Sequence, residues 1–360
     1  MQTSGYDARV FSEWSSRPAD QRFESLEAIT AAIMSRTETA HERTLPLAKL
    51  NFYPDSSGAL VMEPDSSNPV ALNHWAFGQV ASRFSAPAEF LRRLPVDTTA
   101  SVLNTLVSRA ARDPSDPGAK LLLHEGDSFD TARAITSPTY GRIWDRDLVR
   151  LMTRMVDMSG GALFNPREWG GKPGGLYASD SDCFLFFIDG GSLVDGGGER
   201  DQLFRGAYGW NSEVGKCILG LRTFMFQQVC GNFQIWGQRE VREVRIRHTG
   251  RAPERFASEA WGAVKGFLDS STAGEVAAIK AAKARELPTD SKLRLEHVMG
   301  LGFTASEARN GISAAETEIG SCQNYWQLVD GLTMHARSYA TIDRKTDLET
   351  RAGRLMRLDS

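Results

Sequence analysis

Short runs of apolar residues in the middle of the chain constrain its fold more than any other feature. Such runs occur at residues 121–123, 131–135, 184–188, 204–210 and 218–229. The last run exceeds a typical strand, so a bulge, or a helix through residues 217–226, remains open there. After Pro253 the apolar spacing becomes helical to the end of the chain. We therefore predict an α+β protein with a mostly antiparallel central sheet flanked by helices and a helical C-terminal part that packs on the sheet.

Polar and turn-rich segments indicate where the chain divides. Its 360 residues exceed an average domain and fit either one elaborated domain or a core with a helical addition. The first 45 residues are polar with weak helical periodicity, so we expect a peripheral helix or a mobile arm. The Ser-Ser-Thr-Ala-Gly stretch at residues 270–274 is the expected internal boundary. We predict an N-terminal helical arm at residues 1–48, an α+β core at 49–270 and a helical C-terminal region at 271–360.

Several local elements are predicted by their own signals. Two turn-rich stretches at residues 54–58 and 64–69 flank the apolar residues 59–62 and predict a hairpin. Thr304, followed three residues later by Glu307, predicts a capped helix start. Helical spacing predicts helices at residues 69–94, with a break at 85–87, and at 98–112, 143–156 and 325–332.

Composition predicts a globular, cytoplasmic protein without a membrane span. Hydrophobic residues make up 41% and charged residues 24%, and no apolar run approaches the roughly 20 residues of a bilayer-spanning helix. The first residues lack the basic and apolar regions of a secretory signal. Four scattered cysteines without a Cys-x-x-Cys pair argue against a disulfide framework and a zinc site. Because the net charge is −3, affinity for nucleic acid must come from a local patch.

Residues 206–233 interleave aromatic, basic and glycine residues, with Glu213 as the only acidic residue. A surface of this kind can stack flat rings and neutralise phosphates together, as binding of a single-stranded nucleic acid requires. The alternative is an aromatic-rich sheet core, which is the commoner use of such residues. The candidate nucleic-acid-binding residues in and just after this stretch are Trp210, Lys216, Arg222, Phe224 and Trp236.

A second cationic stretch follows at residues 238–255, where arginines outnumber glutamates. In the sequence Val-Arg-Ile-Arg at 244–247, strand alternation places Arg245 and Arg247 on one face, opposite the two apolar residues. These arginines can hold phosphates, or they can be ordinary solvated partners of nearby glutamates. The candidate residues of this stretch, which we call the arginine rail, are Arg239, Arg242, Arg245, Arg247 and Arg251.

No catalytic constellation competes with these candidates. Residues 209–217 have the wrong spacing for a nucleotide-binding loop, with Cys217 where Ser or Thr is required. The carboxylates of Asp180, Asp182 and Asp189 are the best candidates for a metal, but no lysine or histidine lies near them in sequence. The histidines do not fall at ligand spacing, and no Gly-x-Ser-x-Gly turn occurs. We expect no catalytic residues, no metal site and no cofactor.

Three segments carry a resemblance to a known family, at residues 131–149, 210–232 and 324–356. They are similar to the phage- and plasmid-like proteins grouped as domain of unknown function 932. The most specific parts are Asn-Ser-Glu at 211–213 and Cys-Gly-Asn at 230–232, although Gln227 and Gln228 stand where many relatives carry a basic residue. The resemblance implies a mobile-element setting, in a phage, prophage or plasmid, and it supplies no catalytic residues.

Together these features predict a protein that binds single-stranded DNA. The prediction extends to a homo-oligomer that anneals complementary strands in recombination. Arginines of the rail would hold phosphates, while Trp210, Phe224 and Trp236 would stack on bases. Two alternatives remain open. One is a metal-dependent nuclease that uses the three candidate carboxylates, and the other is a protein-interaction module that modulates a host defence or restriction system. We expect a binding protein rather than an enzyme.

Overall fold

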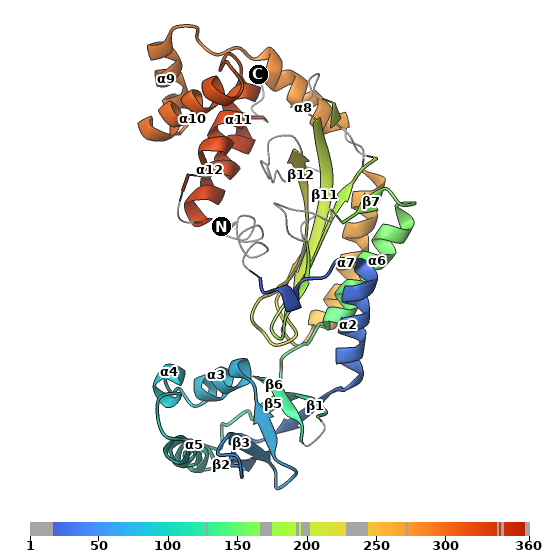
Figure 1. Cartoon of the computed structure of the whole chain (residues 1–360), viewed down its shortest axis with the longest axis vertical. Helices are drawn as coiled ribbons and strands as arrows, with labels where there is room; N and C mark the ends of the chain where they lie inside the picture. The colour runs from blue at the N-terminus through green and yellow to red at the C-terminus, as the bar shows by residue number, and fades with distance from the viewer. Residues whose placement is uncertain are drawn as a thin grey trace.

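The computed structural model describes residues 17–126, 129–165, 175–191, 194–195, 202–227, 244–270, 273–336, 338–339 and 342–356. These residues form eleven α-helices and two mostly antiparallel sheets, which confirms the predicted α+β class. The strands are divided between two sheets, whereas the sequence predicted one central sheet. The first sheet, the second sheet and a group of helices follow one another along the long axis of the molecule (Figure 1). Within the described ranges, no helix has the length and apolar content needed to cross a bilayer.

The first sheet comes from the segment between residues 40 and 136. Its strands are β1 (Ala40–Leu45), β2 (Leu50–Pro54), β3 (Leu60–Pro64), β4 (Val70–Leu72), β5 (Ala119–His124) and β6 (Thr131–Thr136). They lie in the order β1-β5-β6-β4-β3-β2, and β4 and β6 are the parallel pair. The predicted hairpin is confirmed as β2 and β3, and its turn is closed by Asp55, whose carboxylate accepts from the N–H groups of Ser57 and Ala59.

Helices at the predicted positions pack on the first sheet. They are α3 (His74–Arg83), α4 (Ala88–Leu91) and α5 (Val96–Ala110). The side chain of Asn73 caps α3 by accepting from the N–H of Ala76 at 2.8 Å. Asn104 of α5 joins the edge strand β2, because its amide bonds both the N–H and the carbonyl of Phe52 at 2.9 and 2.8 Å. Phe52 and Leu103 are buried together in the core of this unit.

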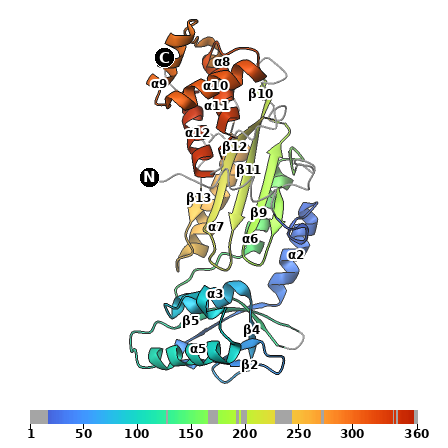
Figure 2. The ribbon, with the colours of Figure 1, turned by 60° about the vertical axis from the view of Figure 1, so that its left-hand side comes forward.

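The second sheet carries four of the ten residues predicted to bind nucleic acid, namely Trp210, Arg222, Phe224 and Arg245. Its strands are β7 (Leu163–Phe164), β8 (Leu176–Ala178), β9 (Cys183–Asp189), β10 (Val194–Asp195), β11 (Gln202–Asn211), β12 (Leu219–Gln227) and β13 (Val244–Ile246). They lie in the order β13-β12-β11-β9-β7, with β8 also on β9 and β10 on β11, and β9, β11 and β12 run side by side in Figure 2. Because β12 pairs with β11 along most of its length, the alternative of a helix through residues 217–226 is wrong.

Helices α2 (Leu26–Glu38), α6 (Asp145–Met158) and α7 (Ala252–Asp269) cover one face of the second sheet. Of the two predicted alternatives for the N-terminal segment, a peripheral helix and a mobile arm, α2 is a helix, and its Ile29 and Ile33 are 0% and 1% exposed in this core. Strand β1, from the same predicted arm, pairs with β5 of the first sheet. The N-terminal segment therefore contributes to both sheets, which its polar composition did not indicate.

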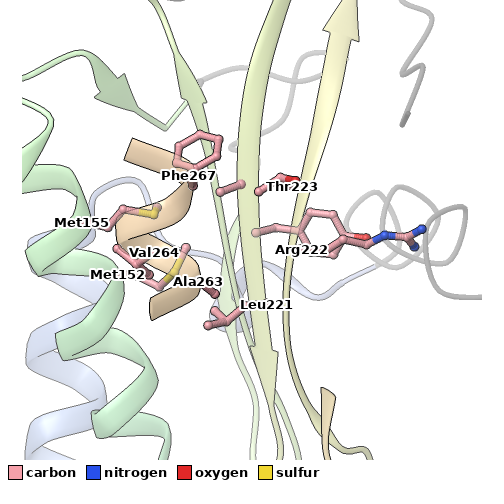
Figure 3. Close-up of a pocket in the computed structure, with 10 residues that line it drawn as sticks. Met152, Met155, Leu221, Arg222, Thr223, Ala263, Val264 and Phe267 are labelled. Atoms are coloured by element: carbon pink, nitrogen blue, oxygen red, sulfur yellow. The ribbon is translucent and has the colours of Figure 1, made fainter. Parts of the chain in front are cut away.

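A small apolar pocket remains where α6 and α7 meet the second sheet (Figure 3). Met152 and Met155 line it from α6, Val264 and Phe267 from α7, and Leu221 from β12. These five side chains are at most 6% exposed. The pocket is therefore a gap in the packing of the core.

The C-terminal helices form a core of their own. They are α8 (Ala273–Ala284), α9 (Ser291–Gly300), α10 (Ala305–Glu318), α11 (Tyr325–Ala336) and α12 (Ile342–Leu355). Helix α11 crosses α10 so closely that a Cβ at Gly331 would lie 2.1 Å from the carbonyl oxygen of Gly311. The predicted cap at Thr304 and Glu307 is confirmed as a capping box. Of these C-terminal helices, α8 contacts the second sheet at β10, whereas the face of that sheet is covered by α2, α6 and α7.

Candidate functional site

One face of the second sheet carries aromatic rings in cross-strand register. Tyr177 pairs with Phe184, Phe184 pairs with Trp210, and Trp210 pairs with Gly220. The ring centroids are 5.3 Å apart for Tyr177 and Phe184, and 5.4 Å apart for Tyr208 and Trp210. Alternate residues of these strands pack against α6 and α7, so the rings occupy the opposite face. We call this surface the aromatic face; its rings are those of Tyr177, Phe184, Phe186, Tyr208 and Trp210.

Cationic residues continue the aromatic face on β12 and β13. Arg222 pairs with Tyr208, and its side chain points away from α6 and α7 (Figure 3). Arg245 pairs with Gly220, beside the ring of Trp210. The strand register therefore places aromatic rings and arginines next to one another on one sheet, as predicted.

The rings of the aromatic face are nevertheless buried. Trp210 is 4% exposed and Tyr208 is 0% exposed. The sequence left two interpretations of Trp210 open, an exposed stacking ring and a residue of the sheet core, and the burial of its ring favours the second. Its indole packs over Gly220, where a Cβ would lie 2.0 Å from the ring. Trp210 is a core residue in this structure, as the alternative interpretation of the sequence held.

The arginine rail is partly within the described residues. On β13, Val244 and Ile246 are buried while Arg245 is exposed, and Arg247 just after the strand is exposed as well, so the predicted alternation is confirmed. Arg251 is exposed at the N-cap of α7. Three other candidates, Trp236, Arg239 and Arg242, lie outside the described residues, as does the side chain of Phe224 on β12.

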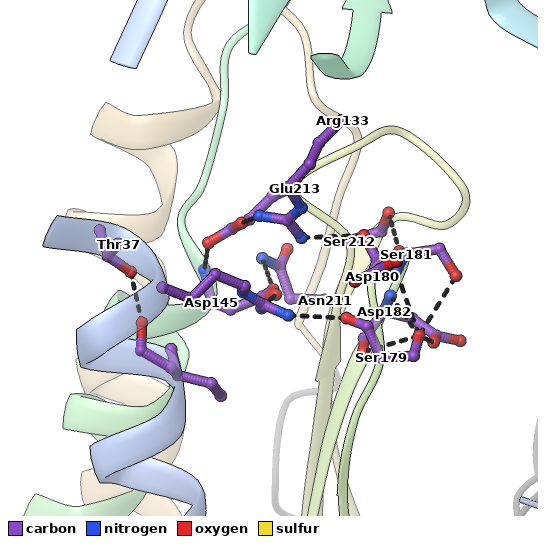
Figure 4. Close-up of polar contacts among 12 residues, drawn as sticks. Thr37, Arg133, Asp145, Ser179, Asp180, Ser181, Asp182, Asn211, Ser212 and Glu213 are labelled. Carbon is purple, nitrogen blue, oxygen red and sulfur yellow. Dashed lines mark hydrogen bonds and ion pairs between the residues drawn. The ribbon is translucent and has the colours of Figure 1, made fainter. Parts of the chain in front are cut away.

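Asp182, in the turn before β9, holds two cations. Arg17 donates from Nη1 to Oδ1 at 2.9 Å and from Nη2 to Oδ2 at 2.7 Å, and Lys216 Nζ lies 2.9 Å from Oδ2. Ser179 donates to the same carboxylate, beside Ser181 in Figure 4. Burial alone would raise the pKa of Asp182, but the hydrogen bonds from Arg17 and Ser179 outweigh it and lower the pKa. Lys216, predicted to contact phosphate, is therefore paired with a carboxylate here.

A buried ion pair joins the two sheets. Arg133 of β6 donates to Oε2 of Glu213 at 2.9 Å and to the carbonyl of Asp180 at 2.8 Å (Figure 4). The side chains of Arg133 and Glu213 are 6% and 2% exposed. Arg142 donates to the backbone carbonyl of Glu213. Burial would raise the pKa of Glu213, but the charges of Arg133 and Arg36 outweigh burial and lower it.

Asp145, at the start of α6, is the second carboxylate of this junction. It accepts from Arg36 at 2.6 Å and from Asn211 at 2.8 Å, and its N–H donates to Glu213 at 2.9 Å. Burial and the nearby charge of Glu213 raise the pKa of Asp145 to about 7, against the opposing effect of Arg36. We call this group the junction network; its members are Arg36, Arg133, Arg142, Asp145, Asn211 and Glu213.

Beside the junction network, the tip of the β11–β12 hairpin docks on the first sheet. Val214 is fully buried against Leu122 and Ala134. Its carbonyl accepts from the indole N–H of Trp75 at 3.0 Å and from the amide of Gln79 at 2.7 Å. Apolar packing and hydrogen bonds at one residue therefore fix the hairpin against the first sheet.

The carboxylates proposed for a nuclease are not brought together. Asp182 precedes β9 and Asp189 ends it, which separates them by about 20 Å along an extended strand. Asp189 is paired with Arg205 at 2.7 Å. In the part of the chain that the structure describes, no group of three or more His, Cys, Asp or Glu side chains could hold a metal ion. The geometry gives the nuclease alternative no support.

Sequence reasoning missed the residues that form the junction network. Arg36, Arg133 and Asp145 come from three separate elements, α2, β6 and α6. A charged residue inside the apolar run at 131–135 was a local signal, because a buried arginine needs an acidic partner. Nothing in the sequence identified that partner as Glu213, which is 80 residues away.

No family model, no curated protein and no solved structure matches this chain. The resemblance to domain of unknown function 932 therefore stays a prediction. Two of the three segments that carry it meet in this structure, because Arg133 and Asp145 contact Glu213. Within the Asn-Ser-Glu residues that make the resemblance specific, Glu213 joins the two sheets through Arg133, and Asn211 bonds to Asp145 of α6.

Proposed function

We propose that this protein binds single-stranded DNA along the β13 edge of the aromatic face. The observation that carries the proposal is the exposure of Arg245 and Arg247 beside a sheet face of aromatic rings. Guanidinium groups bind phosphate oxygens with charge-assisted hydrogen bonds. Arg251 extends the same cationic edge to the start of α7.

The proposal is for a single strand because of the surface that adjoins these arginines. Reading of a duplex usually places a helix or a two-stranded ribbon in the major groove. Here Arg245 lies on a strand of a broader sheet and Arg247 follows that strand directly, next to rings that only unpaired bases can stack upon. Base stacking requires that these buried rings become accessible, so the arginines make the first contact. Annealing by a homo-oligomer in a mobile-element setting is a further part of the proposal and is based on the sequence resemblance.

The test is a charge reversal on β13. We expect the double variant Arg245→Glu/Arg247→Glu to bind a labelled oligothymidine more weakly at every salt concentration. Loss of two phosphate contacts should reduce the slope of log K against log salt by about 1.4. Fluorescence anisotropy over a salt series measures both quantities.

Arg109→Glu/Arg112→Glu is the matched control. This control makes the same change in net charge. Both of its positions are exposed and lie at or just after the end of α5, which packs on the first sheet. It should lower the affinity less and leave the slope near that of the parent. Equal effects of the two double variants, or no binding by the parent protein, would overturn the proposal.

A further inference from the structure

The N-terminal segment lies along β8 at the Tyr177 end of the aromatic face. Arg22 forms an antiparallel bridge with Tyr177, and the N–H of Phe23 donates to the carbonyl of Leu176 at 3.0 Å. The guanidinium of Arg17 lies over the Tyr177 ring, 4.2 Å from its centroid. Residues 17–23 thus place a cation on the outer ring of the row that continues to Phe184 and Trp210.

Ion pairing fastens this segment, in addition to its backbone bonds to β8 and the packing of Phe23 against the core. Two hydrogen bonds from Arg17 to Asp182 hold it at 2.9 and 2.7 Å, and Arg22 Nε donates to the carbonyl of Arg17 at 2.6 Å. Asp182 also binds Lys216, whose side chain is 35% exposed. The carboxylate of Asp182 therefore holds Arg17 over the Tyr177 ring. It also neutralises Lys216, which is exposed enough to contact a phosphate.

We propose that residues 17–23 are a strap that closes the Tyr177 end of the aromatic face, and that single-stranded DNA opens it by competing with Asp182 for Lys216 and Arg17. The inference rests on the proposed function and adds its regulation. A phosphate near Lys216 offers the charge that Asp182 now supplies. Release of Arg17 uncovers the Tyr177 ring, on which a base can then stack.

Two substitutions weaken the strap from opposite sides. Asp182→Asn removes the charge that holds both cations, and Arg17→Ala removes the group that covers Tyr177. Asp182→Asn should raise affinity for oligothymidine by about fivefold, since a closed strap lowers the fraction of protein competent to bind. Arg17→Ala should raise it less, because this variant also loses a cation that can contact phosphate. Asp189→Asn is the control, because it removes a buried carboxylate paired with an arginine at the other end of the same strand. Its affinity should equal that of the parent.

Hydrogen exchange of the unmodified protein gives a second measurement that does not depend on any variant. The N–H of Phe23 should exchange faster when saturating oligothymidine is bound, because its bond to Leu176 breaks as the strap opens. If the parent binds but residues 17–23 exchange no faster, the strap is wrong and the proposed function stands. Parent-like affinity of the folded Asp182→Asn variant leads to the same conclusion. If no form of the protein binds, the proposed function fails and the strap fails with it.

Discussion

The indole ring of Trp210 lies over Gly220 on the neighbouring strand, with no room for a side chain between them. A Cβ at position 220 would lie 2.0 Å from Cζ2 of Trp210 and 2.3 Å from two further ring atoms. Gly220 does not have a positive φ angle, so the space matters here and not the conformational freedom of glycine. The pair fixes the ring within the aromatic face, as large rings covering cross-strand glycines do in other sheets.

Gly220→Ala should therefore destabilise the protein. Adding one methyl group to a packed core costs about 1–3 kcal/mol. Urea unfolding monitored by circular dichroism measures the change. Gly262→Ala on α7 is the matched control, because its Cβ would meet nothing within 4 Å, and the change should stabilise by about 0.5–1 kcal/mol. Equal stability of the two variants would contradict the packing described.

Trp210→Ala should cost about 3–5 kcal/mol of unfolding free energy, since the ring is a core residue. A double-mutant cycle sharpens the test. In the Trp210→Ala background, Gly220→Ala should no longer destabilise, because the ring that it strikes is absent. Large binding losses with unchanged stability would instead restore the exposed stacking role predicted from the sequence.

Breaking the Arg133–Glu213 pair should be strongly destabilising. Glu213→Gln keeps an acceptor for the N–H of Asp145 but leaves Arg133 buried without its counter-charge. A cost of about 3–5 kcal/mol is expected for such a change. Glu259→Gln is the control, because its pair with Arg255 is exposed and should contribute less than about 1 kcal/mol. Similar costs for the two variants would argue against a structural role of the junction network.

Asp145 should make stability fall as pH rises from about 4 to 7. Its pKa is raised from 3.8 to about 7 on folding, so the folded state binds a proton more tightly in this window. The slope from one group is at most about 1.4 kcal/mol per pH unit. His124 and His248 act in the opposite direction, because burial lowers the pKa of each to about 4.

Comparison of the parent with Asp145→Asn isolates this group. The excess stability of the parent over the variant should shrink between pH 5 and pH 7 in urea unfolding experiments. A constant difference across that range would show that Asp145 keeps an ordinary pKa in the folded protein.

Local elements were predictable from the sequence because their signals lie within a few residues. Helices α5 and α6, the capping box at Thr304 and the alternation at Arg245 and Arg247 are examples. The division into two sheets was not predictable, since β1 pairs with β5 nearly 80 residues later. Burial of Trp210 depends equally on residues across the sheet, so its neighbours in sequence could not reveal it.

The docking of Val214 has a consequence for how the molecule transmits motion. The strands that carry Trp210 and Arg222 end at the hairpin tip whose carbonyl is held by Trp75 and Gln79. Because these bonds connect the hairpin tip to α3, we expect a displacement of β11 or β12 to shift α3. By the same contacts, a shift of α3 should displace the two strands. We therefore expect a ligand that moves this hairpin to alter the packing of the first sheet as well, even if it binds far from that sheet.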